Sequence, residues 1–226
     1  MLRFITYNIH SGRDLFWRKR LREMGKTLQL LEADVIGLQE VHQNSKYGFQ
    51  ASYLAEELQY ELAFSPSIPF GDGHYGNAVL SRVPITQFQT IALPSRKEMR
   101  SLLQSTISYK EQIVNIWVTH CSLNQATRHN QMLLIKKLAE QKKESPLVLM
   151  GDFNTVSASF SPVLNDSALA CGGGHLSTII TFQRRIDYIF ASPHWQIHRY
   201  ETIPVKWSDH LPVLTVMELP LPAPEG

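Results

Sequence analysis

The stretch LVLMGDFN at residues 147–154 decides how this chain is expected to fold. Its first four residues are all apolar, a run that is short enough for a buried strand and too short for a helix. The run passes directly into Gly151, Asp152 and Asn154, residue types that favour strand ends and turns over strand interiors. The stretch therefore predicts a buried strand that delivers a carboxylate and a carboxamide to one edge of a sheet.

Further strands and a few helices are expected on both sides of this stretch. Apolar and β-branched runs predict strands at residues 2–9, 35–40, 77–82, 85–93, 101–109, 112–120, 185–191, 195–202 and 211–218. Apolar residues at helical spacing predict helices at residues 18–31, around 51–58 and at 124–143. Helices separate some of the strands but not all, which favours an α/β sandwich with mixed sheets over a regular βαβ ladder.

Length and composition set the outer bounds. The 226 residues predict a single domain over residues 1–219, followed by a proline-rich tail at 220–226. A net charge of +2 excludes a protein that binds polyanions through bulk charge, although it allows a local basic patch. Two cysteines, Cys121 and Cys171, exclude a disulfide framework.

The chain shows no targeting signal. Its start, MLRFITYNIH, lacks a basic segment followed by a long apolar stretch and a cleavage site. No apolar run approaches the roughly 20 residues that cross a bilayer. We therefore expect no transmembrane segment and a cytoplasmic protein, with no obligate protein partner indicated by the sequence; export of a processed form stays open.

Polar side chains that can act as ligands follow several of the expected strands. They are Asn8 and His10, Glu40, His120, Asp152 and Asn154, Asp187, and Asp209 with His210. If these strand ends converge, they form one acidic pocket that also contains histidines. Carboxylate and carboxamide oxygens without a cysteine cluster suit a hard cation such as Mg²⁺, with Mn²⁺ possible. Histidine in such a pocket suits proton transfer, and together these groups predict metal-assisted hydrolysis of a phosphoester by an activated water.

The motifs in the chain resemble those of a known superfamily. They are TYNI (6–9), LQEV (38–41), GNAVLSR (76–82), VTH (118–120), GDFN (151–154), RIDYIF (185–190) and SDHLPV (208–213). Their order resembles the endonuclease/exonuclease/phosphatase superfamily, which has the DNase I-like fold, and especially its small bacterial members. The resemblance implies a four-layer α/β sandwich, in which two mixed sheets pack face to face between outer helices, and a divalent-metal-dependent phosphoesterase.

The resemblance also implies roles for individual residues on the metal side of the site. Glu40 corresponds to the main metal-binding glutamate, and Asn8 corresponds to the asparagine beside that metal. Asp209 corresponds to a further metal ligand. Asp152 corresponds to the aspartate that orients or deprotonates the attacking water, and it is also a candidate ligand for a second metal.

On the substrate side, the resemblance assigns a phosphate contact to Asn154. It gives His210 a phosphate contact or the role of base, and it gives His120 the stabilisation of the phosphoryl charge or the protonation of the leaving group. Asp187 corresponds to the aspartate that orients His210; on the residues alone, it could instead pair with Arg184 or Arg185 at the surface. The resemblance leaves open whether a histidine or an aspartate takes the proton of the water, and whether one or two metals bind.

His10 departs from the superfamily pattern, because many nucleases of this group have Asp or Asn at that position. A neutral imidazole there could bind metal, which favours Mn²⁺ or softer ions, or it could donate a hydrogen bond to the phosphate. A purely structural histidine is the remaining alternative.

Two segments near these motifs have no assigned role. The basic run at residues 18–22 is either a solvated helix face or a contact for nucleic-acid phosphates or anionic lipid. Phe16 and Trp17 beside it could stack on a base, enter a lipid interface or simply pack in the protein. The glycine-rich segment 70–76 is expected to be a mobile surface loop that borders the pocket.

Three functions fit the sequence. The first is a nuclease or phosphodiesterase that cleaves a phosphodiester with Mg²⁺ or Mn²⁺. The second is a phosphatase or a phospholipase C-type phosphodiesterase that acts on a lipid or small-molecule phosphoester. The third, a catalytically inactive binding module, is disfavoured because Glu40, Asp152, Asp187, Asp209 and His210 are all present.

Overall fold

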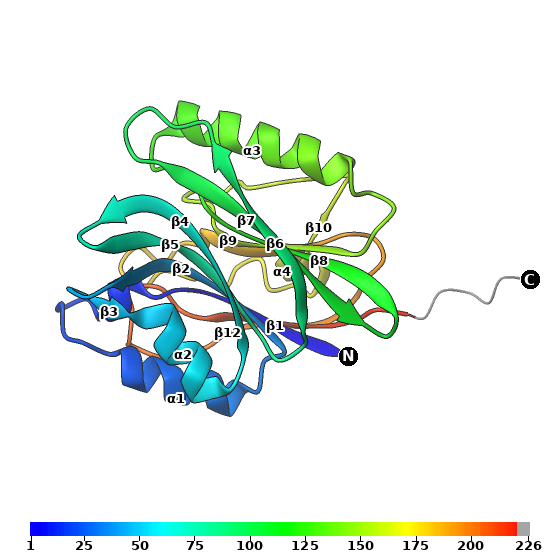
Figure 1. Ribbon diagram of the computed structural model, residues 1–226. Coiled ribbons are helices and arrows are strands. Elements are labelled where there is room, and N and C mark those ends of the chain that lie inside the picture. Colours follow the sequence, from blue (N-terminus) through cyan, green and yellow to red (C-terminus); the bar gives the residue numbers. More distant parts are fainter. Residues whose placement is uncertain (221–226) are drawn as a thin grey trace, which may run out of the picture.

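The computed structural model describes residues 1–220 and consists of two mixed β-sheets packed face to face between outer helices (Figure 1). This arrangement confirms the predicted α/β sandwich. Of the proline-rich tail predicted at 220–226, all but Pro220 lies outside the described residues. Among the described residues, no helix is long and apolar enough to cross a membrane.

The first sheet contains the two ends of the described chain. Its strand order is β12 (Gln196–Thr202), β13 (Val213–Glu218), β1 (Leu2–Asn8), β2 (Val35–Asn44), β5 (Gly73–Ser81) and β4 (Glu61–Phe70), and the short β3 (Gly48–Phe49) pairs with β2. Strands β1 and β2 are parallel, and the other pairs are antiparallel. The parallel pair brings the carboxyl ends of β1 and β2 to the same edge of the sheet.

The second sheet also contains one parallel pair of strands. Its order is β10 (Asn165–Asp166), β11 (Asp187–Ala191), β9 (Leu147–Asp152), β8 (Gln112–His120), β7 (Arg100–Tyr109) and β6 (Ile85–Leu93). Strands β8 and β9 are parallel, so that their carboxyl ends also lie together. Strand β9 contains the LVLMGD part of the stretch that predicted it, and all six of its residues are buried.

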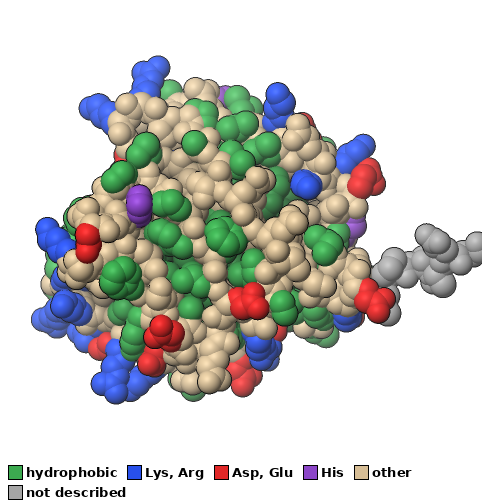
Figure 2. Space-filling model, viewed as in Figure 1, with side chains coloured by type: hydrophobic (Ala, Val, Ile, Leu, Met, Phe, Trp, Pro, Cys, Tyr) green, Lys and Arg blue, Asp and Glu red, His purple; other side chains and the backbone are tan. Residues whose placement is uncertain are grey.

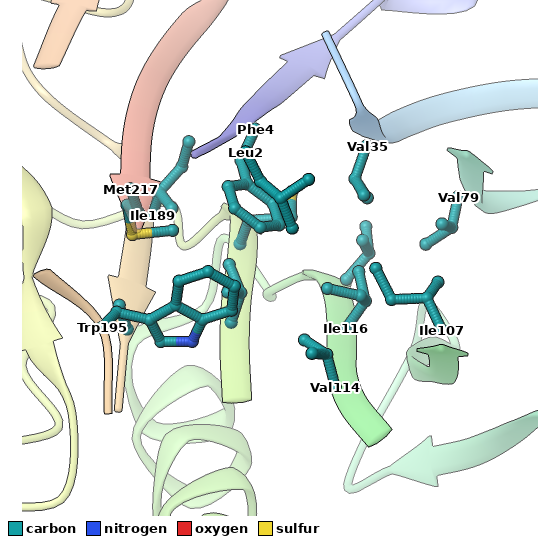
Figure 3. Close-up of a cluster of buried hydrophobic side chains, with 14 of the residues drawn as sticks. Leu2, Phe4, Val35, Val79, Ile107, Val114, Ile116, Ile189, Trp195 and Met217 are labelled. Carbon is teal, nitrogen blue, oxygen red and sulfur yellow. The ribbon is translucent and has the colours of Figure 1, made fainter. Parts of the chain in front are cut away.

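The space between the sheets is filled by apolar side chains from both (Figure 3). Phe4 of β1 packs edge-on against Trp195, with ring centroids 5.3 Å apart. Helices α1 (Leu21–Leu31) and α2 (Gln50–Leu58) cover the outer face of the first sheet, and α3 (Gln125–Glu140) covers that of the second (Figure 1). The short helices η1 (His10–Gly12) and α4 (Ser167–Ala170) complete the fold.

Some element boundaries differ from the predicted ones. Helix α1 begins at Leu21 and not at residue 18, because residues 13–19 form a tight turn closed by a bridge between Arg13 and Lys19. Strand β4 (Glu61–Phe70) was not predicted, since its two prolines are untypical of a strand interior. Proline is tolerated here because β4 is an edge strand.

The glycine-rich segment 70–76 was expected to be a loop and is instead a β-hairpin. Strands β4 and β5 extend to Phe70 and from Gly73, so that only Gly71 and Asp72 form the turn. Strand β5 therefore begins four residues before the predicted start at residue 77. The hairpin places Tyr75 opposite His42 of β2, next to the predicted site.

Gly37 tests how closely the two sheets approach. A Cβ at this position of β2 would lie 2.7 Å from Val118 Cγ2 and 2.8 Å from Met150 Sδ of the second sheet. We expect Gly37→Ala to lower the free energy of unfolding by about 1–3 kcal/mol, as overpacked cores do. Urea denaturation would measure the change.

Gly25 provides the matched control. It lies in α1, where a Cβ would meet only Leu54 Cδ2 at 3.4 Å. Gly25→Ala should leave stability unchanged or raise it by up to about 1 kcal/mol through helix propensity. Equal stability of Gly37→Ala and the wild type would contradict the close contact between the sheets.

Candidate active site

The polar strand ends of both sheets meet at one end of the sandwich, on the left in Figure 1, where β1 and β2 finish. In the parallel pair β8–β9, His120 is in register with Asp152. In the antiparallel pair β9–β11, Asp152 is in register with Asp187. Two carboxylates and an imidazole therefore start from three adjacent strands of the second sheet.

A β-bulge places Glu40 at this end of the first sheet. The pairing of β2 with β5 shifts register between Leu38 and Val41, and Glu40 in the bulge has a φ of 59°. Non-glycine residues rarely adopt this left-handed conformation, and bulges often re-aim a side chain next to a functional site. Here the bulge brings Glu40 Oε1 to 3.1 Å from Asn8 Nδ2.

The Asn8 carboxamide connects the two sheets. Its Nδ2 donates to Glu40 Oε1 and to Asp152 Oδ2, both at 3.1 Å, while its Oδ1 accepts from the backbone N–H of His10 at 3.0 Å. Asn8 is fully buried. Carboxylates from opposite sheets are thus held on either side of one amide group.

Asp152 lies at the centre of the site. Its Oδ1 accepts from the backbone N–H of Asn154 at 2.8 Å, and the Asn154 carboxamide donates to the carbonyl of Cys121 at 2.9 Å. The preceding Gly151 has a φ of 147°, and a Cβ there would lie 1.9 Å from the carbonyl oxygen of Thr119. Only glycine allows this close approach of β9 to β8 beside the aspartate.

His210 and Asp187 form the predicted pair. His210 Nδ1 lies 2.8 Å from Asp187 Oδ2, and the same oxygen accepts from the Thr178 hydroxyl at 2.6 Å. The alternative pairing of Asp187 with an arginine is wrong, because Arg185 instead binds Asp166 at 2.7 Å. Asp187 Oδ2 is therefore engaged by both His210 and Thr178.

The segment that carries His210 is tied to β1 through Ser208. The Ser208 hydroxyl donates to the Asn8 carbonyl at 2.7 Å and accepts from the His210 backbone N–H at 3.1 Å. It also lies 3.2 Å from Asp209 Oδ1, the next carboxylate along the chain. His10 Nδ1 lies 3.7 Å from Asp209 Oδ1, and both side chains are more exposed than that of Asp152.

Two imidazoles approach the same oxygen of Asp152. His120 Nε2 lies 3.5 Å and His210 Nε2 lies 3.7 Å from Asp152 Oδ2. All three side chains are almost completely buried. Proton exchange between a carboxylate and an imidazole needs this kind of proximity.

Burial and neighbouring charges set the protonation states. Burial and the charge of Asp187 raise the pKa of Asp152 to about 7. Burial lowers the pKa of His210, but the carboxylates of Asp187, Asp152 and Asp209 outweigh this effect and raise the pKa to about 10. Burial together with the positive charges of Arg100 and His210 lowers the pKa of His120 well below its ordinary value. The site thus pairs a cationic histidine with a neutral one.

The donor set fits a hard divalent cation. Glu40 Oε1 and Asp152 Oδ2 are brought together on one amide, and both are oxygen donors. Asp187 Oδ1 is buried without a hydrogen-bond partner among residues 1–220. The carboxylates of Asp152 and Asp187 and the imidazole of His210 lie in one compact cluster. Burial, and after it the charge of Asp187, raise the pKa of Asp152, and a nearby positive charge would favour its ionised form.

Sequence reasoning missed Arg100, the first residue of β7. Its side chain is 6% exposed, is bound to Glu98 at 2.8 Å, and has an Nε without a partner among the described residues. Its charge acts on His120 and on Tyr75, a half-buried tyrosine whose pKa is raised by burial and by Glu40. Arg100 lies just before the predicted strand 101–109 and no motif marked it, whereas Tyr75 lies in the segment 70–76 that was expected to border the pocket.

Comparison with known proteins agrees with this geometry. The pattern of the Endonuclease/Exonuclease/phosphatase family matches residues 5–210. The chain belongs to this family. Its members hydrolyse phosphoesters.

Individual relatives are similar over large parts of the chain. The uncharacterized protein YbhP of Escherichia coli (strain K12) is 27% identical over 165 residues, which cover 66% of this chain and 65% of that protein. The chain thus matches just under two thirds of the length of this relative.

Solved structures share the fold at lower identity. D. rerio TDP2 in complex with a single-strand DNA product has a TM-score of 0.79 at 20% identity, covering 96% of this chain and 98% of that one. The mannosyl-6-phosphatase Bt3783 of Bacteroides thetaiotaomicron has a TM-score of 0.75 at 20% identity, covering 96% and 100%.

The pairing of His210 with Asp187 can be tested by titration. In the metal-free protein we expect His210 to keep its proton until the pH approaches about 10, because its pKa is raised by the carboxylates. The stabilisation from this pair is therefore complete below the unfolded-state pKa of about 6.5 and is lost as the pH rises through about 10. In Asp187→Asn, the pKa of His210 should fall.

NMR titration of the histidine ring measures this pKa directly. Asp166→Asn is the matched control, since Asp166 binds Arg185 and not His210. An unchanged His210 pKa in Asp187→Asn would contradict the electrostatic role of this carboxylate.

Proposed function

We propose that this protein is a divalent-metal-dependent phosphodiesterase, of nuclease or related type, that cleaves a phosphodiester by attack of an activated water. The observation that carries the proposal is the convergence on one oxygen of Asp152. Asn8 Nδ2 lies 3.1 Å from Oδ2, and the Nε2 atoms of His120 and His210 lie 3.5 and 3.7 Å from it. An inactive binding module has no need to bury such a costly set of charges.

Four residues would hold the cation. They are Glu40 and Asp152, which share the Asn8 carboxamide, Asn8 itself, and Asp209 at the more exposed side of the site. Mg²⁺ suits these oxygen donors, and Mn²⁺ is the second choice, favoured if the His10 imidazole also binds. A cation held here supplies positive charge that offsets the carboxylates and the phosphate.

The Asp152–His210 pair handles the proton of the attacking water. Asp187 fixes the orientation of the His210 ring through Nδ1, which leaves Nε2 pointing toward Asp152. Asp152 Oδ2 lies within 3.7 Å of His210 Nε2, which is close enough for a proton to pass between the carboxylate and the imidazole. The Asp187–His210 pair then keeps positive charge beside the reacting phosphate.

Contacts to the phosphate oxygens come from the opposite side. His120 ends β8 and Asn154 follows β9, and the backbone N–H of Asn154 donates to Asp152 Oδ1. His10 borders the site through Asp209. Arg100, which the sequence did not suggest, adds a buried positive charge beside His120. These donors suit the charge that develops on the phosphoryl oxygens.

The central residues provide the first test of this proposal. With bis(p-nitrophenyl) phosphate as substrate, chelation by EDTA should abolish hydrolysis, and Mg²⁺ or Mn²⁺ should restore it. Asp152→Ala and His210→Ala should each lower kcat/KM by about 100-fold or more, the range that general acid–base groups contribute. Circular dichroism should show folded variants.

Matched controls are available far from the site. His198→Ala removes a histidine of β12 that lies near Glu218, and Glu201→Ala removes a carboxylate paired with Arg199. Both should retain wild-type activity. Near-normal hydrolysis by folded Asp152→Ala or His210→Ala would contradict the proposed mechanism.

Arg100 is tested separately. We expect Arg100→Met to lower kcat on the same substrate about 10-fold or more, because a donor for the phosphoryl oxygens is lost. The affinity for Mg²⁺, measured by isothermal titration calorimetry, should change little, since Arg100 holds no metal in this scheme. Unchanged kcat in a folded variant would exclude a role for Arg100 in the reaction.

A further inference from the structure

Residues 13–19, the segment just before α1, form a tight turn that exposes three consecutive apolar side chains. Leu15 is 39% exposed, Phe16 is 74% exposed and Trp17 is 60% exposed. We call these three residues the apolar tip. Scattered apolar residues are normal on a surface, but three in a row at the end of a turn are a concentrated patch that water solvates poorly.

The turn is held rigidly by Asp14, which is 5% exposed. Its Oδ1 accepts from the backbone N–H groups of Phe16 and Arg18, at 2.9 and 3.0 Å, and its Oδ2 accepts from Arg20 Nε at 2.9 Å. Trp17 has a φ of 60°, a conformation that a flexible loop would not keep. The exposure of the apolar tip is thus built into the fold.

The apolar tip borders the active site. The Trp17 ring lies 5.0 Å from the His10 ring, centroid to centroid, and His10 Nδ1 lies 3.7 Å from Asp209 Oδ1. A surface that covered the apolar tip would therefore lie next to the entrance of the site.

Positive charge surrounds the apolar tip. Between residues 13 and 22 the chain has five basic residues and one acidic residue, whereas its overall net charge is only +2. Arg18 and Lys19 are exposed, and Arg18 lies over the Phe16 ring at 5.3 Å. Figure 2 shows Lys and Arg side chains gathered at the lower left, where Figure 1 places α1 and the chain that leads into it.

We propose that the apolar tip inserts into an anionic lipid surface and holds the active site against the phosphate headgroups. The apolar and aromatic side chains at the end of the turn match the acyl-chain region of a membrane. The arginine and lysine beside them match its anionic headgroups. The membrane-binding part stands on the apolar tip alone. Its consequence, that the phosphodiester substrate is a phospholipid, rests on the proposed function.

Single-stranded nucleic acid fits these residues less well. Nucleic acid would also be attracted by Arg18 and Lys19, and its bases could stack on Phe16 or Trp17. Leu15, however, has no aromatic face, so that a base gains little from it. Its exposure beside two aromatic residues is accounted for by a lipid interior and not by stacking.

Vesicle binding of the protein tests the proposal. We expect the wild type to co-sediment with vesicles of phosphatidylcholine containing phosphatidylglycerol, and about 10-fold more weakly with pure phosphatidylcholine, because each basic residue near an anionic surface adds attraction. Leu15→Ser/Phe16→Ser should weaken binding to the anionic vesicles at least about 10-fold, since the inserted apolar surface is lost.

A matched control variant is Phe88→Ser/Ile113→Ser. It also removes two exposed apolar side chains, 55% and 54% exposed, but from β6 and β8. It should bind anionic vesicles like the wild type. Equal loss of binding in both double variants would overturn the role of the apolar tip.

Tryptophan fluorescence gives an independent readout. Trp17 is the most exposed of the four tryptophans, because Trp117 and Trp195 are buried and Trp207 is half-buried. Anionic vesicles should shift the emission to shorter wavelength in the wild type and not in Trp17→Phe. No shift in the wild type, or the same shift in both, would overturn insertion of Trp17.

The two proposals fail in different ways. Bis(p-nitrophenyl) phosphate is soluble, so Leu15→Ser/Phe16→Ser should hydrolyse it like the wild type. A wild type that hydrolyses it but does not bind anionic vesicles overturns only the membrane proposal. Tight binding of a single-stranded oligonucleotide that depends on Phe16, without vesicle binding, overturns it in favour of nucleic acid. Vesicle binding without any hydrolysis overturns only the phosphodiesterase.

Discussion

The site depends on the burial of two carboxylates side by side. Asp152 and Asp187 are in register on neighbouring strands, and both are almost completely excluded from water. Burial disfavours the ionised form of each carboxylate and the two like charges repel each other, and both effects raise the pKa of Asp152. His210 relieves part of it by pairing with Asp187, and Asn8 donates to Asp152.

The sequence predicted the sandwich and located the polar strand ends because both depend on local patterns. An apolar run such as residues 147–150 predicts a buried strand wherever it lies in a fold. Asp152 and Asp187 were identified because a carboxylate directly follows or begins such a strand, within a recognisable motif. The pairing of Asp187 with His210, 23 positions apart, came only from the resemblance to the family.

What could not be predicted depends on contacts between distant residues or on backbone geometry. Arg100 begins a strand without a motif, and the antiparallel pairing of β7 with β8 places its charge near His120. Helix α1 was predicted to begin at residue 18, because the apolar spacing that begins at Leu21 does not mark where a helix starts, whereas the Asp14 carboxylate accepts from the backbone N–H groups of Phe16 and Arg18 and keeps them in a turn. The hairpin at Tyr75 was not predicted, because its strands contain glycines and prolines, which are untypical of strands away from a sheet edge.

The division of the site between the two sheets has a consequence for the whole molecule. Asn8 and Glu40 belong to the first sheet, whereas His120, Asp152 and Asp187 belong to the second, and mainly apolar packing joins the two. A small sliding of one layer over the other would separate Glu40 from Asp152 without breaking any strand pairing. Catalysis is sensitive to displacements of about 1 Å. Activity would therefore depend on how firmly the apolar core holds the two sheets together. On heating, activity should be lost at a lower temperature than the secondary structure.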